Sequence, residues 1–437
     1  MRTQLPLIIM LSAGAAFAQA RQSAPAPVQT TQMATPPPVS GLSYATQVGS
    51  EVQRNYLRGG LTYSTSYVDN FYANSGNPSV AETTISILPT LALDASSARQ
   101  HATVTYSPGF TLFYPSNALN EVDHTAAVNY EFRLTPHATV SAMERFQDSS
   151  SPYFPSDEGI VSGVPVSTTP GAVPPFAKRL TNFANAEITM QTGLNDMVGA
   201  SGISTVLHYP NTSQTPGLFD SNSFGGTAFY NHRLSGSQYV GATYQYLDML
   251  TYPAEGETTT TTSTVMGFYT IYPSPKLSLS VSGGPQYYRV GAPLQTPLSS
   301  WVPSEMGSIG WQGDRTSFAA SYSQSVTGAG GLLGAYHTGN ANASMRWRLA
   351  RTWTAGVSGT YAINKSVGST PAMTAGNGHT LAGSASLQHP IRGQVSLAFN
   401  YERAHQSYGQ VPVIAANPDS DRVSVAITWN FMHPLGN

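Results

Sequence analysis

Side chains that could act as catalysts are few and scattered along this chain. Ten histidines occur, and none belongs to an H-E-x-x-H pattern, nor does a G-x-S-x-G pattern exist. The usual residues of zinc-dependent hydrolysis and of a nucleophile elbow are therefore missing. The absence of cysteine excludes disulfides, thiolate metal sites and a thiol nucleophile. We expect no enzyme, no cofactor and no metal. A catalytic Asp/His pair near the ends of predicted strands remains an alternative, and its candidate residues are Asp123, His124, His208, His337 and His405.

A second set of candidates consists of charged side chains that share the polar face of alternating segments. These are Arg58, Glu131, Arg133, Glu187, Arg346, Arg348 and Glu402. Successive side chains on a strand point to opposite faces, so in a closed barrel these seven charges face the lumen. Arg133, Arg346 and Arg348 lie close to short turns, where a ring of charge sets ion selectivity. The alternative is that the charges pair with one another and brace the wall.

The longest connection, residues 149–178, is a third candidate. This proline-rich stretch carries Asp157 and Glu158 beside an apolar patch of Ile160, Val161 and Val164. An apolar patch in a polar loop is better buried than exposed to water. We therefore expect the loop to fold into the lumen and constrict it, with the two carboxylates facing basic residues. An external lid or a mobile loop is the alternative.

The elements that must position these residues are strands. Only 10% of the residues are charged, whereas soluble domains have about 25%. Past the N-terminus, no apolar run of about 20 residues could cross a bilayer as a helix. The period is instead two, as in the terminal segment 423–431, and the segments run for about 10 to 14 residues, long enough for tilted transmembrane strands. The net charge of -2 gives no basic surface for nucleic acid.

Connections between the segments alternate between short and long. The short ones fall near 96–98, 135–137, 194–196, 235–237, 273–275, 313–315, 350–351 and 390–392. The long ones fall near 69–80, 114–121, 149–178, 210–221, 253–257, 291–302, 328–335, 366–377 and 407–418. This rhythm predicts an all-β, antiparallel, up-and-down transmembrane β-barrel of about 18 strands, or 16, with short periplasmic turns and long extracellular loops.

The two ends of the chain complete the predicted organisation. Residues 1–20 read as a cleaved signal peptide, with Arg2 before a short apolar run and small residues at the cleavage site. Residues 21–53 form a Pro-rich periplasmic linker, 54–431 the barrel and 432–437 a C-terminal extension. Aromatic residues near strand ends predict an interfacial girdle. They are Tyr67, Tyr114, Tyr209, Tyr252, Tyr272, Trp353 and Trp429.

The signal peptide, alternating strands and turn/loop rhythm resemble the bacterial outer-membrane β-barrel class. Within that class, the terminal strand ending at Trp429 and Phe431 resembles the signal read by the barrel-assembly machinery, although six residues follow it. The resemblance implies an outer-membrane location, contact with lipid, and a channel. We expect diffusion or export of small polar or carbohydrate-like solutes, by analogy with porins or exopolysaccharide exporters. The alternative is a structural or adaptor barrel whose Pro-rich arm docks a periplasmic partner. The oligomeric state stays open.

Overall fold

A computed structural model describes residues 55–71, 80–150, 160–161, 164–165, 178–211, 217–253, 256–292, 296–328, 334–367, 377–408 and 419–435. The predicted signal peptide and linker, and the loop residues Asp157 and Glu158, lie outside these ranges. No helix among the described residues is long and apolar enough to cross a membrane.

Eighteen long strands and one short hairpin make up the described chain. The first ten elements in order are β1 (Tyr56–Val68), β2 (Glu82–Ser96), β3 (Gln100–Tyr114), the 3-10 turn η1 (Asn117–Leu119), β4 (Glu121–Thr135), β5 (Ala138–Ser149), β6 (Ile160–Val161), β7 (Val164–Pro165), β8 (Arg179–Gln191) and β9 (Asp196–His208). The others are β10 (Ser221–Ser235), β11 (Gln238–Thr251), β12 (Thr258–Ser274), β13 (Leu277–Gly291), β14 (Leu298–Gln312), β15 (Thr316–Gly328), β16 (Ala335–Arg348), β17 (Thr354–Ser366), β18 (Gly378–Arg392), β19 (Val395–Tyr408) and β20 (Asp419–Pro434).

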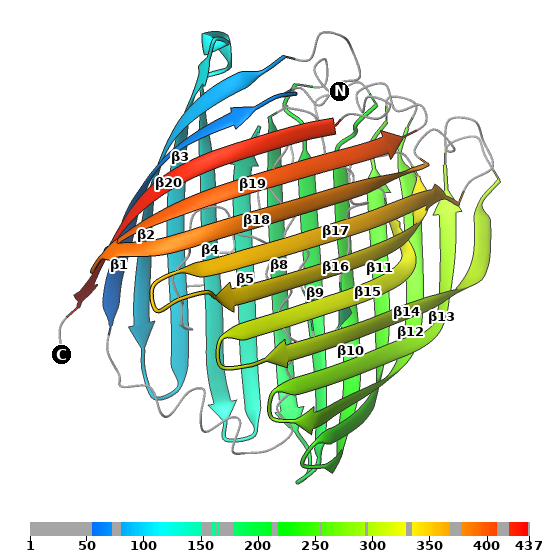
Figure 1. Ribbon diagram of the computed structural model, residues 1–437. Coiled ribbons are helices and arrows are strands. Elements are labelled where there is room, and N and C mark those ends of the chain that lie inside the picture. The colour runs from blue at the N-terminus through cyan, green and yellow to red at the C-terminus, as the bar shows by residue number, and fades with distance from the viewer. Residues whose placement is uncertain are drawn as a thin grey trace.

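The long strands form one closed antiparallel sheet (Figure 1). Each strand pairs with the next along the chain, with β5 followed by β8, and β20 pairs with β1 to close the ring. Closure matters because a sheet edge in lipid would leave backbone N–H and C=O groups unpaired. The predicted up-and-down barrel of 18 strands is confirmed. The eight short turns and nine longer connections fall close to the predicted positions, with two corrections. Residues 298–302, predicted as loop, belong to β14, and the turn predicted near 390–392 follows the end of β18 at 393–394.

The two faces of the wall differ as a period of two requires. On β20, Val423, Ile427 and Trp429 are exposed on the outer face, whereas Ala426 and Thr428 on the inner face are buried. The same alternation on the other strands gives an exterior of exposed Leu, Ile, Val, Tyr and Trp side chains. An apolar exterior is what a strand facing acyl chains needs.

Strand β20 extends beyond the aromatic residue at which the sequence pattern places the end of the barrel. Met432, His433 and Pro434 continue the ladder with β1, opposite Arg58, Leu57 and Tyr56. The described part of the predicted extension is therefore mostly wall.

Candidate functional site

The seven charged residues singled out in the sequence all lie on strands and, by register, on the inner face of the wall. Two of them form ion pairs with residues that the sequence analysis passed over. Arg58 on β1 pairs with Asp94 on β2, and Glu402 on β19 pairs with Arg422 on β20 at 3.5 Å. Asp94 and Arg422 have the inward parity of their strands, so parity combined with register is the signal that could have found them. Both pairs bridge neighbouring strands, as the bracing hypothesis expects.

The three arginines predicted near the periplasmic mouth lie close to short turns. Arg133 is near the end of β4, and Arg346 and Arg348 are at the end of β16. In the ring order, β4 and β16 are separated by many strands on either side, so these cations flank different walls of the same mouth. Their effect on ion selectivity stays a prediction.

The inner wall also has an apolar stripe that the sequence did not predict. Ile203 on β9 packs with Leu247 and Met249 on β11, and Phe183 on β8 covers the cluster. Nearer the short turns, Met197 packs with Phe229, beside Tyr239. These side chains have inward parity.

Strand β9 has apolar residues on both faces, so its sequence lacks the polar–apolar alternation that identifies an inner face. The stripe could therefore not be seen in the sequence, although it makes this part of the lumen apolar. The wall offers hydroxyl and amide groups over most of its inner surface and apolar contact over β8 to β11.

One junction of the wall is only half paired. Strand β14 pairs with β13 from Leu298 to Trp311, and β15 pairs with β16 from Thr316 to Gly328. Between β14 and β15, the ladder runs only from Gln312–Ser317 to Glu305–Gln324. The outer half of β14, residues 298–304, thus has no β15 partner among the described residues.

The outer end of β15 instead turns onto the inner face of β13. The side-chain amide of Gln286 on β13 donates to the carbonyl oxygen of Val326 at 3.1 Å and accepts from its N–H at 2.6 Å. By parity Val326 belongs to the outer face of β15, yet it is 2% exposed and packs with the inward residues Tyr288 and Val290. The ends of β14 and β15 therefore overlap instead of lying edge to edge.

A pocket lies at this junction and combines residues of both faces of the wall. Inward residues such as Thr264, Gln286 and Ser304 line it together with Glu305 and Gln324. Glu305 is exposed and has the outward parity of Trp301 and Ile309 on β14. A carboxylate on the lipid-facing side of a strand is costly, so Glu305 is a candidate functional residue. We call residues 298–305 and 324–328 with Gln286 the β14–β15 seam.

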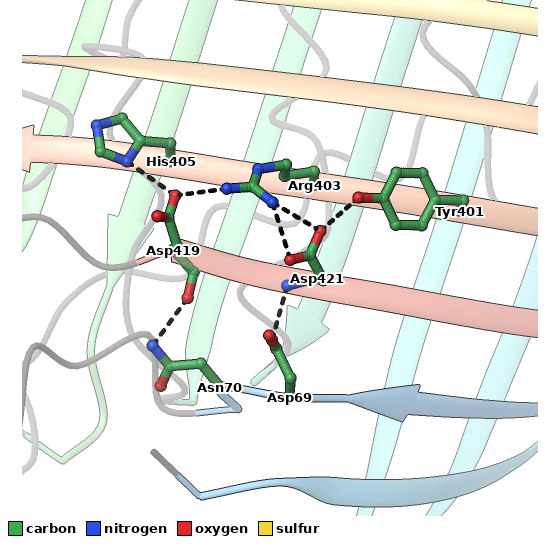
Figure 2. Close-up of polar contacts among 7 residues, drawn as sticks. All are labelled: Asp69, Asn70, Tyr401, Arg403, His405, Asp419 and Asp421. Carbon is green, nitrogen blue, oxygen red and sulfur yellow. Dashed lines mark hydrogen bonds and ion pairs between the residues drawn. The ribbon is translucent and has the colours of Figure 1, made fainter. Parts of the chain in front are cut away.

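A polar cluster on the outer surface ties the ends of the barrel together (Figure 2). Arg403 on β19 bonds to Asp421 at 3.1 Å and lies 3.5 Å from Asp419, and these two carboxylates also accept from Tyr401 and bond to His405. Just after β1, the Asp69 carboxylate accepts the N–H of Asp421 at 2.7 Å. Asn70 donates to the carbonyl oxygen of Asp419 at 2.9 Å. We call these seven residues the closure cluster.

The histidines considered for rim chemistry sit in separate contacts. The Nδ1 atom of His124 lies 2.9 Å from the Tyr106 hydroxyl, that of His208 2.6 Å from Asp220, and that of His405 2.9 Å from Asp419. No group of three or more His, Asp or Glu side chains that could hold a metal occurs in the described ranges. These arrangements are polar contacts near strand ends.

The long connection after β5 is described only in part. Residues 160–161 and 164–165 pair as the hairpin β6–β7. The predicted constriction therefore stays a proposal.

The predicted aromatic girdle is only partly correct. Tyr67, Tyr114, Tyr252 and Trp429 are exposed. Tyr272 has inward parity and packs edge-on against Tyr239. Tyr209 is buried just after β9, and burial raises the pKa of its hydroxyl to about 12. Trp353 lies in a turn and stacks on His389. Position near a strand end is thus insufficient without the parity of the side chain.

A closed antiparallel ring with an apolar exterior, short turns at one end and long loops at the other is a β-barrel of the bacterial outer-membrane class. The bacterial outer membrane is its location, as the sequence predicts.

No protein-family model matches the sequence, and no curated protein matches it closely enough to be a relative. Among solved structures, the FrpB iron transporter from Neisseria meningitidis (F3-3 variant) is similar at 10% identity and a TM-score of 0.45, covering 90% of this chain and 83% of that one. OccAB4 from Acinetobacter baumannii has 9% identity and a TM-score of 0.44, covering 87% and 98%. OpdQ from Pseudomonas aeruginosa has 9% identity and a TM-score of 0.44, covering 88% and 100%. Likenesses this remote carry no argument about the function of this chain.

Proposed function

We propose that this barrel is a channel for small solutes. The observation that carries the proposal is the closed ring of 18 strands itself, because a ring of this size encloses more space than its wall side chains can fill. The inner face offers mostly hydroxyl and amide groups, with two of its charges already neutralised by partners on the wall. Such a lining favours small, mostly uncharged polar or carbohydrate-like solutes over ions.

The apolar stripe over β8 to β11 refines the proposed solute. A sugar or similar molecule has polar edges and less polar faces, so it can donate hydrogen bonds to one wall while lying against Ile203, Leu247 and Met249 on the other. Arg133, Arg346 and Arg348 give a weak preference for anions at the periplasmic mouth.

Single-channel conductance of the refolded protein in a planar bilayer tests the proposal. We expect steady conductance from the full mature chain, and a larger value on deletion of residues 157–164 if that loop constricts the lumen. Unchanged conductance in the deletion variant would contradict the constriction alone.

A matched variant without residues 21–53 tests the alternative role of the Pro-rich arm. Conductance only in this shortened form would make the arm a plug. Silence from both forms, in protein shown to be folded, would contradict the channel and favour the structural or adaptor barrel.

A further inference from the structure

We propose that the β14–β15 seam is a lateral gate through which an amphipathic molecule passes between the lumen and the membrane. This inference goes beyond a channel that joins the two ends of the barrel. It rests on the wall alone and does not need either mouth to be open.

The first ground is the interrupted ladder. Lipid supplies no hydrogen bonds, so an unpaired sheet edge is tolerated in a membrane only where protein covers it or it lines a wet cavity. Beyond the last pair, Glu305–Gln324, the register would place Ser304 opposite Ser325. These two residues both line the pocket instead of forming a further pair. The interruption is thus built into the wall at the position of a cavity.

The second ground is that a side chain holds the wall apart. Gln286 bonds both the N–H and the carbonyl oxygen of Val326, and its own side chain is 4% exposed. A primary amide has a donor and an acceptor in the arrangement of a backbone peptide. The register would place Pro303 of β14 opposite Val326. Proline has a carbonyl oxygen but no N–H, so Gln286 gives Val326 both a donor and an acceptor where β14 could give only the acceptor.

These contacts define two arrangements of the outer end of β15. In the arrangement seen here, Val326 is held on the inner face of β13 by Gln286 and by contact with Tyr288 and Val290. In the other, residues 325–328 lie along residues 301–304 of β14 and close the wall, with one ladder bond missing because Pro303 has no N–H to donate to Val326. An element with two such packings is what a gate requires.

The third ground is the chemistry of the seam, which runs from lumen to lipid. On the inside, Leu247 and Met266 reach the pocket from the region of the apolar stripe, and the Ser304 hydroxyl lies 3.8 Å from the Met266 sulfur. On the outside stand the Glu305 carboxylate and the Gln324 amide, to which the Tyr322 hydroxyl donates at 2.6 Å. On the inside, Leu247, Met266, Met306 and Val326 therefore offer apolar contacts among polar side chains such as Thr262 and Thr264, and on the outside Glu305 and Gln324 offer polar contacts to a head group.

The charge of the seam sets the class of molecule. The residues that line the pocket include one carboxylate and no lysine or arginine. An anionic head group would face Glu305 without a compensating cation. The structure therefore assigns the gate to single-chain amphiphiles with an uncharged or cationic head group that donates hydrogen bonds.

Brominated phospholipids test lipid access directly, because bromine quenches a fluorophore only on close approach. The chain has no cysteine, so a bimane label on a single introduced thiol reports one site. We would label Ser325→Cys at the seam. Ser386→Cys is the matched inner-wall control, because its ladder to both neighbouring strands is unbroken. Leu381→Cys, on the exposed outer face of the same strand, gives the full effect of lipid.

In vesicles containing brominated phosphatidylcholine, we expect the Ser325→Cys probe to be quenched several-fold more than the Ser386→Cys probe and less than the Leu381→Cys probe. Adding Gln286→Ala should lower quenching at the seam toward the Ser386→Cys value, because β15 is released to pair with β14. Folding of each variant is checked by its heat-modifiable mobility. Equal quenching at Ser325→Cys and Ser386→Cys, or no change on adding Gln286→Ala, would overturn the gate.

The head-group class is tested on the same thiol without changing the protein further. Dodecylamine and dodecyl maltoside should slow the reaction of the Ser325→Cys thiol with a water-soluble maleimide, whereas laurate should not. Equal protection by laurate would overturn the assignment of head-group charge. A barrel that is silent in planar bilayers but shows this quenching pattern would lose the proposed channel and keep the gate.

Discussion

The barrel has two junctions that invite comparison, the closure between β1 and β20 and the seam between β14 and β15. At the closure, strands from opposite ends of the chain pair without interruption from Tyr56–Pro434 to Val68–Arg422. At the seam, strands joined by a short turn pair over only part of their length. Nearness in sequence therefore does not decide where this wall is strongest.

The two junctions differ in the side-chain contacts beside their backbone ladders. The closure has the Thr62 and Thr428 hydroxyls 3.0 Å apart on the inside and the closure cluster outside (Figure 2). The seam has instead a side chain, Gln286, that competes for the backbone of Val326. The closure thus has side-chain contacts on both faces of its ladder. At the seam, a side chain offers the backbone of β15 a partner other than β14.

Cysteine pairs across the two junctions should give the largest contrast. Thr62→Cys with Thr428→Cys places two thiols on directly opposed residues, at the separation a disulfide needs. Ser304→Cys with Ser325→Cys places them where the ladder has stopped. After mild oxidation, we expect nearly complete cross-linking of the closure pair and little of the seam pair, read as loss of free thiol. Rapid and complete cross-linking at the seam would mean that the wall is sealed there.

Glycines near the two junctions should differ next. A Cβ added at Gly284, on β13 beside the seam, would lie 1.9 Å from the carbonyl oxygen of Val265. This oxygen is a backbone atom and cannot turn aside as a side chain can. At Gly59 in the closure it would meet the Phe431 ring at 2.3 Å, and that ring can turn outward. The neighbouring Gly283 leaves 3.6 Å to the nearest atom, the carbonyl oxygen of Ser304.

We therefore expect Gly284→Ala to lower the free energy of unfolding by about 1–3 kcal/mol, the usual cost of overpacking. Gly59→Ala should cost less, and Gly283→Ala should be nearly neutral and serve as the control. Urea unfolding followed by heat-modifiable mobility measures all three. A Gly283→Ala variant as unstable as Gly284→Ala would show that chain stiffness, not close approach, sets the effect.

The closure could be predicted from the sequence, whereas at the seam Pro303 signals only that a ladder is interrupted and not what replaces it. Strict alternation in 423–431 and the count of turns and loops already predict a barrel with an even number of strands, in which the last strand pairs with the first. At the seam, parity assigns Val326 to the outer face, and only the inward turn of β15 buries it. Gln286 looks like one more polar lumen residue, because its partner is backbone, which carries no sequence signal.

The candidate lumen charges show the same limit on a smaller scale. Parity identifies Arg58 and Glu402 as inward, but their partners Asp94 and Arg422 emerge only once the register between strands is known. The apolar stripe on β9 was hidden for the opposite reason. The inner face of β9 presents Met197, Ile203 and Leu207, which are the apolar residues expected on an outer face.

The smallest expected change in stability comes from a substitution in the closure cluster. It tests whether the backbone ladder or the ion pairs of the cluster stabilise the closure. Arg403 is 53% exposed and faces Asp419 and Asp421, and exposed ion pairs contribute about 0–1 kcal/mol. We expect Arg403→Gln to cost at most that much, and less at high salt, where charges are screened. Lys276→Gln, which removes the exposed turn pair with Asp314, is the matched control. A larger, salt-independent loss of stability for Arg403→Gln would mean that this guanidinium, and not the backbone ladder, is the main stabiliser of the closure. The difference between the closure and the seam would then be a difference in side-chain contacts alone.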